Sequence, residues 1–329
     1  MSTIFKIGIF CFIFSIVLIN NTVNTFSKKR PIIGILSQET TRFSDNEKSY
    51  IAASYVKFVE GAGARVVPIR INQSRSYYRD LMTKISGVLL PGGATSIKHG
   101  GYANAGEIIY QIAEDMNRNG TYFPILGICL GFELLAFLAS GKEMKRVSCN
   151  SESQALPLQF ERNFKQSRLF TNASEEIIDI LEKDEVTINF HIFCITKEKF
   201  KTHRLNRNWR IISQNNDENG IRFISSMEHI NFPFYGLQFH PEKNIYEWII
   251  GRNIPHSSNA IKVSQYFANF FVDEARKNKN KFSDRDEEMT KLIYNYPPPL
   301  YTGNTNSYRS VFQQIYLWSE NDLPMLNFN

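Results

Sequence analysis

Three short segments of the chain carry side chains of the kinds that cleave amide bonds. The first contains Cys129 between two glycines, Gly127 and Gly131, at the junction of a strand-like and a helix-like apolar run. A G-x-nucleophile-x-G turn exposes its central side chain at the carboxyl end of a parallel strand. The helix N-terminus beyond the cysteine favours its thiolate. The turn predicts a nucleophile, although a buried structural cysteine fits this segment alone as well.

The second segment is the run His240, Pro241, Glu242, which follows a strand-like run from Tyr235 to Phe239. A nucleophilic cysteine needs a base that accepts its proton and a third group that orients that base. Side chains two residues apart lie on one side of an extended segment. We therefore expect His240 beside the cysteine with Glu242 behind it. Without the cysteine turn, this tripeptide would indicate little.

The third segment ends an apolar run with a glycine pair, Gly92 and Gly93. Backbone N–H groups of such a turn, together with the N–H of Leu130 after the nucleophile, would form an oxyanion hole for a tetrahedral intermediate. An ordinary turn is the alternative interpretation of this segment.

Strand-like and helix-like runs alternate along the first half of the chain. The strand-like runs are apolar at every position, as expected for strands buried on both faces. The sequence therefore predicts an α/β fold, a three-layer sandwich with a mostly parallel central sheet flanked by helices. The expected strands are Ile32 to Leu36, Val66 to Ile71, Gly87 to Leu90 and Phe123 to Ile128, and the expected helices begin near Ser49 and span Tyr77 to Ile85 and Ala103 to Arg118.

After Gly141 the runs become mostly strand-like, which predicts additional antiparallel strands in the C-terminal half. Arg210 to Gln214 and Ile221 to Ser225, joined by a polar turn, have the pattern of a hairpin. A final helix is expected from Val263 to Lys277. The stretch from Leu292 to Trp318 is too rich in aromatic residues for a flexible tail, so we expect it to pack onto the core.

The first residues have the layout of a secretory signal peptide. Lys6 precedes an apolar run from Ile7 to Ile19, which is shorter than the roughly 20 residues needed to span a bilayer. An uncleaved anchor or a buried helix is the alternative. We expect residues 1–27 to be removed, although no cleavage site is obvious, and residues 28–329 to form one catalytic domain without a membrane span. The expected location is the extracellular space or the lysosome.

The remaining cysteines agree with a secretory route. Loss of the leader leaves Cys129, Cys149 and Cys194, so at least one thiol is free or forms an intermolecular bridge. The sequence contains no distances and leaves open whether Cys149 and Cys194 are bridged. The N-x-S/T acceptors for glycosylation are Asn72, Asn119 and Asn172.

The formal net charge is +6, but Lys and Arg are spread along the chain. Their densest cluster, from Lys277 to Lys281, follows a helix-like run and reads as a solvated helix end. We therefore expect no nucleic-acid partner.

Taken together, the three segments resemble the class I glutamine amidotransferase-like family, in which a Cys-His-Glu triad lies on an α/β sandwich. Within it the chain resembles the γ-glutamyl hydrolases over nearly its whole mature length. The matching motifs are Arg30 to Leu36, Tyr50 to Lys57, Ala62 to Pro68, Leu130 to Glu133, Asn189 to His191, His240 to Lys243, Tyr246 to Trp248 and Tyr301 to Asn304.

The resemblance implies catalytic roles for Cys129, His240 and Glu242, oxyanion donors at Gly93 and Leu130, and substrate contacts at Gly92, Glu133 and His191. The carboxylate of Glu133 would pair with an α-ammonium group, although an ordinary charge on a first helical turn would look identical. His191 would contact the substrate or be a hydrogen-bonded core histidine. The sequence after His191, Ile192 to Cys194, is less polar than the family pattern and leaves substrate detail open.

These roles imply attack by the Cys129 thiolate on a γ-glutamyl carbonyl, a thioester, and its hydrolysis by water with His240 as base. The implied substrates are poly-γ-glutamyl folates, with no metal or organic cofactor, and the implied assembly is a homodimer. Two alternatives stay open: a glutamine-hydrolysing domain that supplies a synthase with ammonia, and a catalytically inactive binding protein on the same fold. The choice between endo- and exo-cleavage also stays open.

Overall fold

Strands that are buried on both faces form the centre of the main sheet. The structure is a computed structural model and describes residues 30–40, 47–302 and 312–319. The parallel strands are β1 (Ile32–Leu36), β4 (Arg65–Ile69), β5 (Gly87–Leu90), β6 (Ile125–Ile128) and β12 (Phe234–Leu237), in the spatial order β4-β1-β5-β6-β12. Because nearly all their side chains are buried, this sheet needs cover on both faces.

Three antiparallel strands extend the main sheet beyond β12. They are β11 (Arg222–His229), β10 (Trp209–Asn216) and the short β8 (Gln159–Phe160). The predicted hairpin is confirmed, since β10 and β11 pair antiparallel with Asn216 opposite Arg222. The prediction of antiparallel strands in the C-terminal half is confirmed with it.

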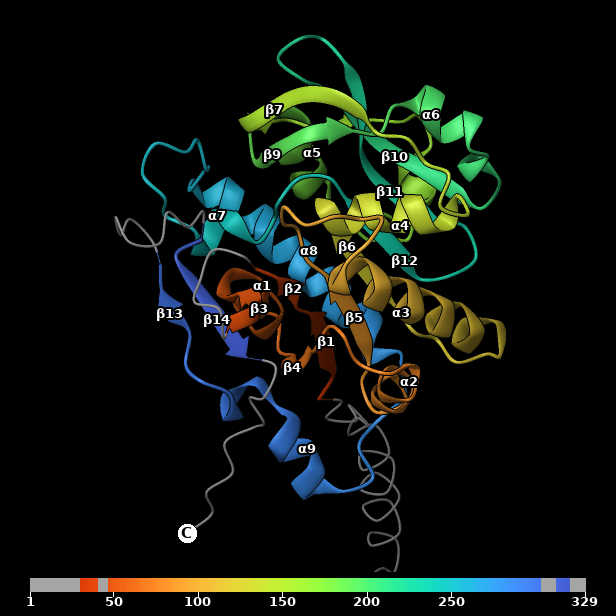
Figure 1. The fold of residues 1–329 in the computed structure, drawn as a ribbon. Coiled ribbons are helices and arrows are strands. Elements are labelled where there is room, and N and C mark those ends of the chain that lie inside the picture. Colours follow the sequence, from red (N-terminus) through yellow and green to blue (C-terminus); the bar gives the residue numbers. More distant parts are fainter. Residues whose placement is uncertain (1–29, 41–46, 303–311, 320–329) are drawn as a thin grey trace, which may run out of the picture. The chain divides into compact units, whose positions relative to one another are not determined.

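Helices cover both faces of the sheet (Figure 1). One layer contains α1 (Ala53–Glu60), α5 (Glu175–Lys183), α7 (Lys243–Tyr246) and α8 (Ser258–Arg276), and the other contains α2 (Arg75–Met82), α3 (Gly101–Arg118) and α4 (Leu130–Ala139). Each layer forms its own apolar cluster against the sheet. The predicted three-layer α/β sandwich is confirmed.

A second sheet joins the two ends of the domain. It contains β2 (Gln38–Glu39), β3 (Glu47–Ala52), β13 (Leu300–Tyr301) and β14 (Gln314–Ser319), in the order β13-β14-β3-β2. Ile315, Leu317 and Trp318 are buried, so the prediction that the C-terminal stretch packs onto the core is confirmed for its described part. The expected helix start near Ser49 is wrong, because the backbone there pairs with β14 and helix α1 begins only at Ala53.

A two-stranded sheet of β7 (Val147–Leu156) and β9 (Thr187–Cys194) completes the β structure near the site. The helices α6 (Lys197–Thr202) and α9 (Arg285–Lys291) lie outside the two layers named above. The described residues from Pro31 onward form one compact unit. None of the described helices has the length and apolar character needed to cross a bilayer. The expected signal peptide, residues 1–27, lies outside the described residues.

Candidate active site

Cys129 lies at the strand-to-helix turn that the sequence predicts. It follows β6 directly, precedes α4, and has a φ of 52°, a conformation that side chains rarely adopt. Its N–H donates to the carbonyl of Leu237 on β12 over 2.7 Å. A side chain at Gly127 would collide with the backbone of Gly131, and one at Gly131 would collide with the carbonyl of Leu90. The two glycines therefore allow the turn to press against the neighbouring strand.

The thiol of Cys129 is free and 5% exposed. Burial raises its pKa, and the nearby charges of Glu133 and Glu242 raise it further. The N–H of Leu130 and the ammonium of Lys243 act in the opposite direction. These shifts favour the protonated thiol, so a nucleophilic role for Cys129 would require a base that removes its proton.

His240 and Glu242 form a buried pair after β12. The Nδ1 atom of His240 lies 2.7 Å from Glu242 Oε1. Burial lowers the pKa of His240, although the Glu242 charge opposes this. The pKa of Glu242 is also lowered, because the His240 and Lys243 charges and the hydrogen bond outweigh its burial. A neutral imidazole that donates from Nδ1 to the carboxylate keeps its Nε2 lone pair free to accept a proton.

The side chains of Cys129 and His240 meet at Gly92. A methyl group added to Gly92 would lie 2.7 Å from His240 Cε1 and 3.0 Å from Cys129 Cβ. The N–H of Gly92 donates to the hydroxyl of Tyr55 over 2.9 Å, and the same hydroxyl lies 3.4 Å from His240 Nδ1. The glycine therefore leaves room for the two reactive side chains, while its own N–H is already engaged.

The side chain of Gln38 is bonded to the turn that contains Gly92 and Gly93. Its amide donates to the carbonyls of Pro91 and Gly92 over 3.1 and 3.2 Å. A side chain at Gly93 would collide with the Gln38 amide, which explains the second glycine of the pair. Neither Gln38 nor Tyr55 was predicted from the sequence to lie at the site. No local pattern marks them, since their partners are far away in the chain.

Glu133 lies on the first turn of α4, with its N–H bonded to the carbonyl of Cys129 over 3.0 Å. Its side chain is 3% exposed, and both carboxylate oxygens have partners. Oε2 accepts from Arg146 Nη1, and Oε1 accepts from Gln238 Nε2 over 3.3 Å. Burial raises the pKa of this carboxyl, while Arg146 favours its charged form. The expected contact with an α-ammonium group stays a prediction, and it now has a competitor in Arg146.

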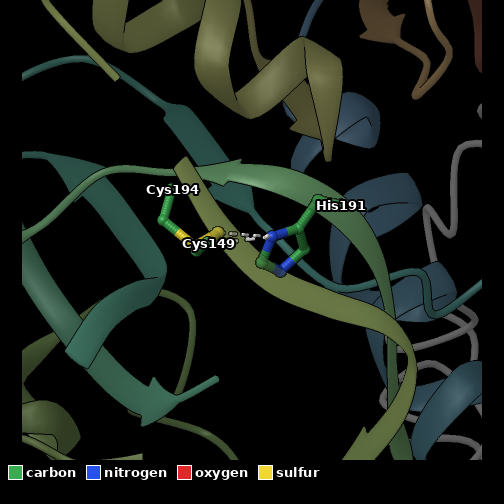
Figure 2. A group of neighbouring side chains, drawn as sticks. All are labelled: Cys149, His191 and Cys194. Atoms are coloured by element: carbon green, nitrogen blue, oxygen red, sulfur yellow. Dashed lines mark hydrogen bonds between the residues drawn. A yellow bond between two sulfur atoms is a disulfide. The ribbon is translucent and has the colours of Figure 1, made fainter. Parts of the chain in front are cut away.

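His191 lies beside a disulfide between Cys149 and Cys194, which joins β7 to β9 (Figure 2). Its Nδ1 is 3.6 Å from each sulfur, and its Nε2 is 3.1 Å from Asn189 Oδ1. Burial, together with the charge of His240, lowers the pKa of His191 to about 3. The ring is therefore neutral and held on both sides, and its expected contact with the substrate stays a prediction.

The disulfide answers the question that the sequence left open. Cys149 and Cys194 are bridged, with 5.9 Å between their Cα atoms, so Cys129 is the free cysteine of the described residues. The sulfurs of this pair and the His191 ring are close enough to surround a metal ion. Because the two sulfurs are bonded to each other, they do not offer thiolate ligands in this form.

The three expected glycosylation acceptors, Asn72, Asn119 and Asn172, are all exposed. Exposure is required for glycosylation and does not by itself establish it, so these sites stay predictions.

A family model and several known proteins match this chain. The family model described as Peptidase C26 matches residues 31–242, a range that runs from the start of β1 to Glu242. The γ-glutamyl hydrolase of Rattus norvegicus is 43% identical over 293 residues, which cover 88% of this chain and 90% of the relative. The γ-glutamyl hydrolase of Homo sapiens is 40% identical with the same coverage.

Among solved structures, the chain is similar to the glutaminase domain of CTPS from Trypanosoma brucei with bound acivicin. The TM-score is 0.48 at 14% identity, and the match covers 78% of this chain and 98% of that one.

Proposed function

Because the chain belongs to the peptidase C26 family, we propose that it is a cysteine hydrolase that cleaves γ-glutamyl amide bonds. Relatives named γ-glutamyl hydrolase are matched over nine-tenths of their own length. We extend the proposal to poly-γ-glutamyl chains, carried by folates, as the substrate class. One observation carries the proposal. The free Cys129, with its positive φ, and the buried His240–Glu242 pair both lie beside Gly92.

The proposed reaction begins from a neutral pair. As the γ-carbonyl carbon is attacked, the Cys129 proton passes to His240 Nε2 and the sulfur bonds to that carbon. Glu242 stabilises the imidazolium that forms, and its pairing with Nδ1 holds the ring in the required tautomer. The C–N bond then breaks, and the amine leaves with the proton from His240. Water attacks the resulting thioester with His240 as base, which releases the carboxylic acid and restores the thiol.

The oxyanion of the tetrahedral intermediate needs N–H donors that point at it. We assign this role to Leu130, whose N–H faces the Cys129 sulfur, and to Gly93, whose backbone Gln38 holds in place. Gly92 contributes space for the substrate carbonyl between the two reactive side chains. His191, on the strand beside His240, is assigned a contact with the more distant part of the substrate.

The test uses the purified mature protein and a synthetic pteroyl-poly-γ-glutamate. The wild-type protein should shorten the chain, with products followed by chromatography. Cys129→Ala and His240→Asn should lose this activity to background, because each removes a group that forms or activates the nucleophile.

The matched control is His229→Asn. His229 is also buried, and burial lowers its pKa to about 4, but it packs against Trp209 and Phe232. This variant should keep most of the activity. Hydrolysis of free glutamine without chain shortening would replace our proposal by the amidotransferase alternative. If the folded wild-type protein shows neither activity, the result favours the inactive binding protein.

A further inference from the structure

The carboxylate one helical turn beyond the nucleophile already has a cationic partner within the protein. Glu133 is buried, and its two oxygens are bonded to Arg146 and to Gln238. Its N–H donates to the carbonyl of Cys129 over 3.0 Å, so Glu133 lies one helical turn from the nucleophile. The groups near Glu133 that could bind a substrate are therefore the remaining N–H donors of Arg146.

Arg146 is held from two sides and retains unused donors. Its Nη1 donates to Glu133, and its guanidinium carbon lies 4.3 Å from the centre of the Phe193 ring on β9. Within the described part of the chain, its remaining N–H groups make no further hydrogen bond that the structure records. The side chain is 20% exposed and is therefore partly open to solvent. A guanidinium presents five N–H donors in a planar fork that matches a carboxylate.

The proposed substrates have matching chemistry. In a poly-γ-glutamyl chain, the α-nitrogen of each internal unit is acylated and carries no positive charge, while its α-carboxylate is free. Three carbon atoms separate that carboxylate from the γ-carbonyl that is attacked. Glu133 follows the nucleophile by one helical turn, a rise of roughly 5–6 Å, which is comparable to the length of one such unit. A substrate carboxylate at this distance from the nucleophile would be repelled by a Glu133 that had no cationic partner, and it would be attracted by Arg146.

We propose that Arg146 binds the α-carboxylate of the glutamyl unit whose γ-carbonyl is attacked, and that Glu133 is a positioning residue that holds Arg146. This inference rests on the proposed function and adds a specificity subsite to it. Phe193 supports the guanidinium from its other face. The subsite selects γ-linked glutamyl units, because another acyl group would leave the guanidinium without an anion.

The experiment compares two substrates that differ at one group. One is pteroyl-γ-glutamyl-γ-glutamate, and the other carries a carboxamide in place of the α-carboxylate on the attacked unit. Wild type should prefer the carboxylate substrate by about 10- to 100-fold in kcat/KM, the range of one hydrogen bond to a charged group. Arg146→Met should lose that preference, mainly through a higher KM for the carboxylate substrate. The substrate preference of Arg146→Lys should lie between those of the wild type and Arg146→Met.

The matched control is Arg118→Met, at the far end of α3. Arg118 is also paired with a carboxylate, Glu114 at 3.3 Å, and also lies over an aromatic ring, Phe232. This variant should keep the wild-type preference. Because Arg146→Met leaves the buried Glu133 without its cationic partner, the double variant Glu133→Gln with Arg146→Met guards against a folding defect. It should show the same loss of preference.

The outcomes separate this inference from the proposed function. Equal losses by Arg146→Met on both substrates would show a purely structural role and overturn the subsite. A wild type that cleaves both substrates equally well would also overturn it, while leaving the hydrolase intact. A wild type that cleaves neither contradicts the proposed function itself.

Discussion

The reactive pair rests in its neutral form. Burial raises the pKa of the Cys129 thiol and lowers the pKa of the His240 imidazole, so both shifts disfavour the charged thiolate–imidazolium pair. The carboxylate of Glu242 favours the imidazolium, and it becomes most useful once His240 has accepted the proton. In the proposed mechanism, proton transfer is therefore coupled to attack on the substrate.

This arrangement predicts an acid limit of activity below the ordinary histidine range. Only neutral His240 can accept the thiol proton, and its pKa is lowered from 6.5. The profile of kcat/KM against pH should therefore stay level as the pH falls through 6.5 and decline only at lower pH.

The same pH profile should change in the variant Glu242→Gln. Because Glu242 raises the pKa of His240, its removal should move the acid limit to still lower pH and reduce kcat by about 100-fold or more. Glu228→Gln, at another buried carboxyl, should leave the profile unchanged. An acid limit at or above pH 6.5 in the wild type would contradict the assigned resting state.

The β7–β9 pair connects the disulfide to the site. Its strand β9 carries Phe190, whose ring lies 6.0 Å from the His240 ring, and Ile188, whose carbonyl accepts from the N–H of His240 over 2.9 Å. The same strand ends at Cys194, which is bonded to Cys149. The disulfide therefore anchors the far end of the strand that supports the base.

Removal of this bridge should destabilise the protein. Cys149 and Cys194 are 45 residues apart. A disulfide of this kind stabilises the folded protein by about 2–4 kcal/mol, because it restricts the conformations of the unfolded chain. The double variant Cys149→Ser with Cys194→Ser should lose about that free energy of unfolding, measured by urea titration. Wild type treated with a dithiol reductant should match the variant, and equal stability of all three samples would rule out a stabilising bridge.

The domain as a whole is closed by a sheet made from its two ends. Strand β14 pairs with β3, and the buried Trp318 packs edge-on against Tyr296. We propose that this domain is exported through the secretory pathway as a homodimer, to the extracellular space or the lysosome. The leader-like first residues and the exposed sequons support that route.

Expression of the full chain in a eukaryotic secretory host tests this proposal. The secreted protein should begin near residue 28, lose mass on treatment with an N-glycosidase, and have the mass of a dimer by light scattering. Substitutions Asn72→Gln, Asn119→Gln and Asn172→Gln should each remove one glycan from an occupied site. An unglycosylated product that keeps Met1 would refute the route, and a monomer would refute the dimer.

Much of the site could be predicted from local pattern. The bounds of β1 and β5 agree with the sequence prediction, because an apolar run between turn residues specifies a buried strand without reference to any partner. The turn at Cys129 was also predictable, since the two glycines and the change from strand to helix are adjacent in the chain. The same holds for the β10–β11 hairpin, whose two strands are joined by one short turn.

Other features depend on partners that are distant in the chain. Residues 47–52 are a strand because β14, more than two hundred residues later, supplies their hydrogen bonds, and a helical pattern alone cannot reveal this. Gln38 and Tyr55 hold the glycine turn and the base only because separate strands and helices bring them together. The pairing of Cys149 with Cys194 and of Glu133 with Arg146 likewise follows from packing, which brings together residues that are far apart in the chain. A buried charge such as Glu133 needs a partner, and the linear order does not show which residue supplies it.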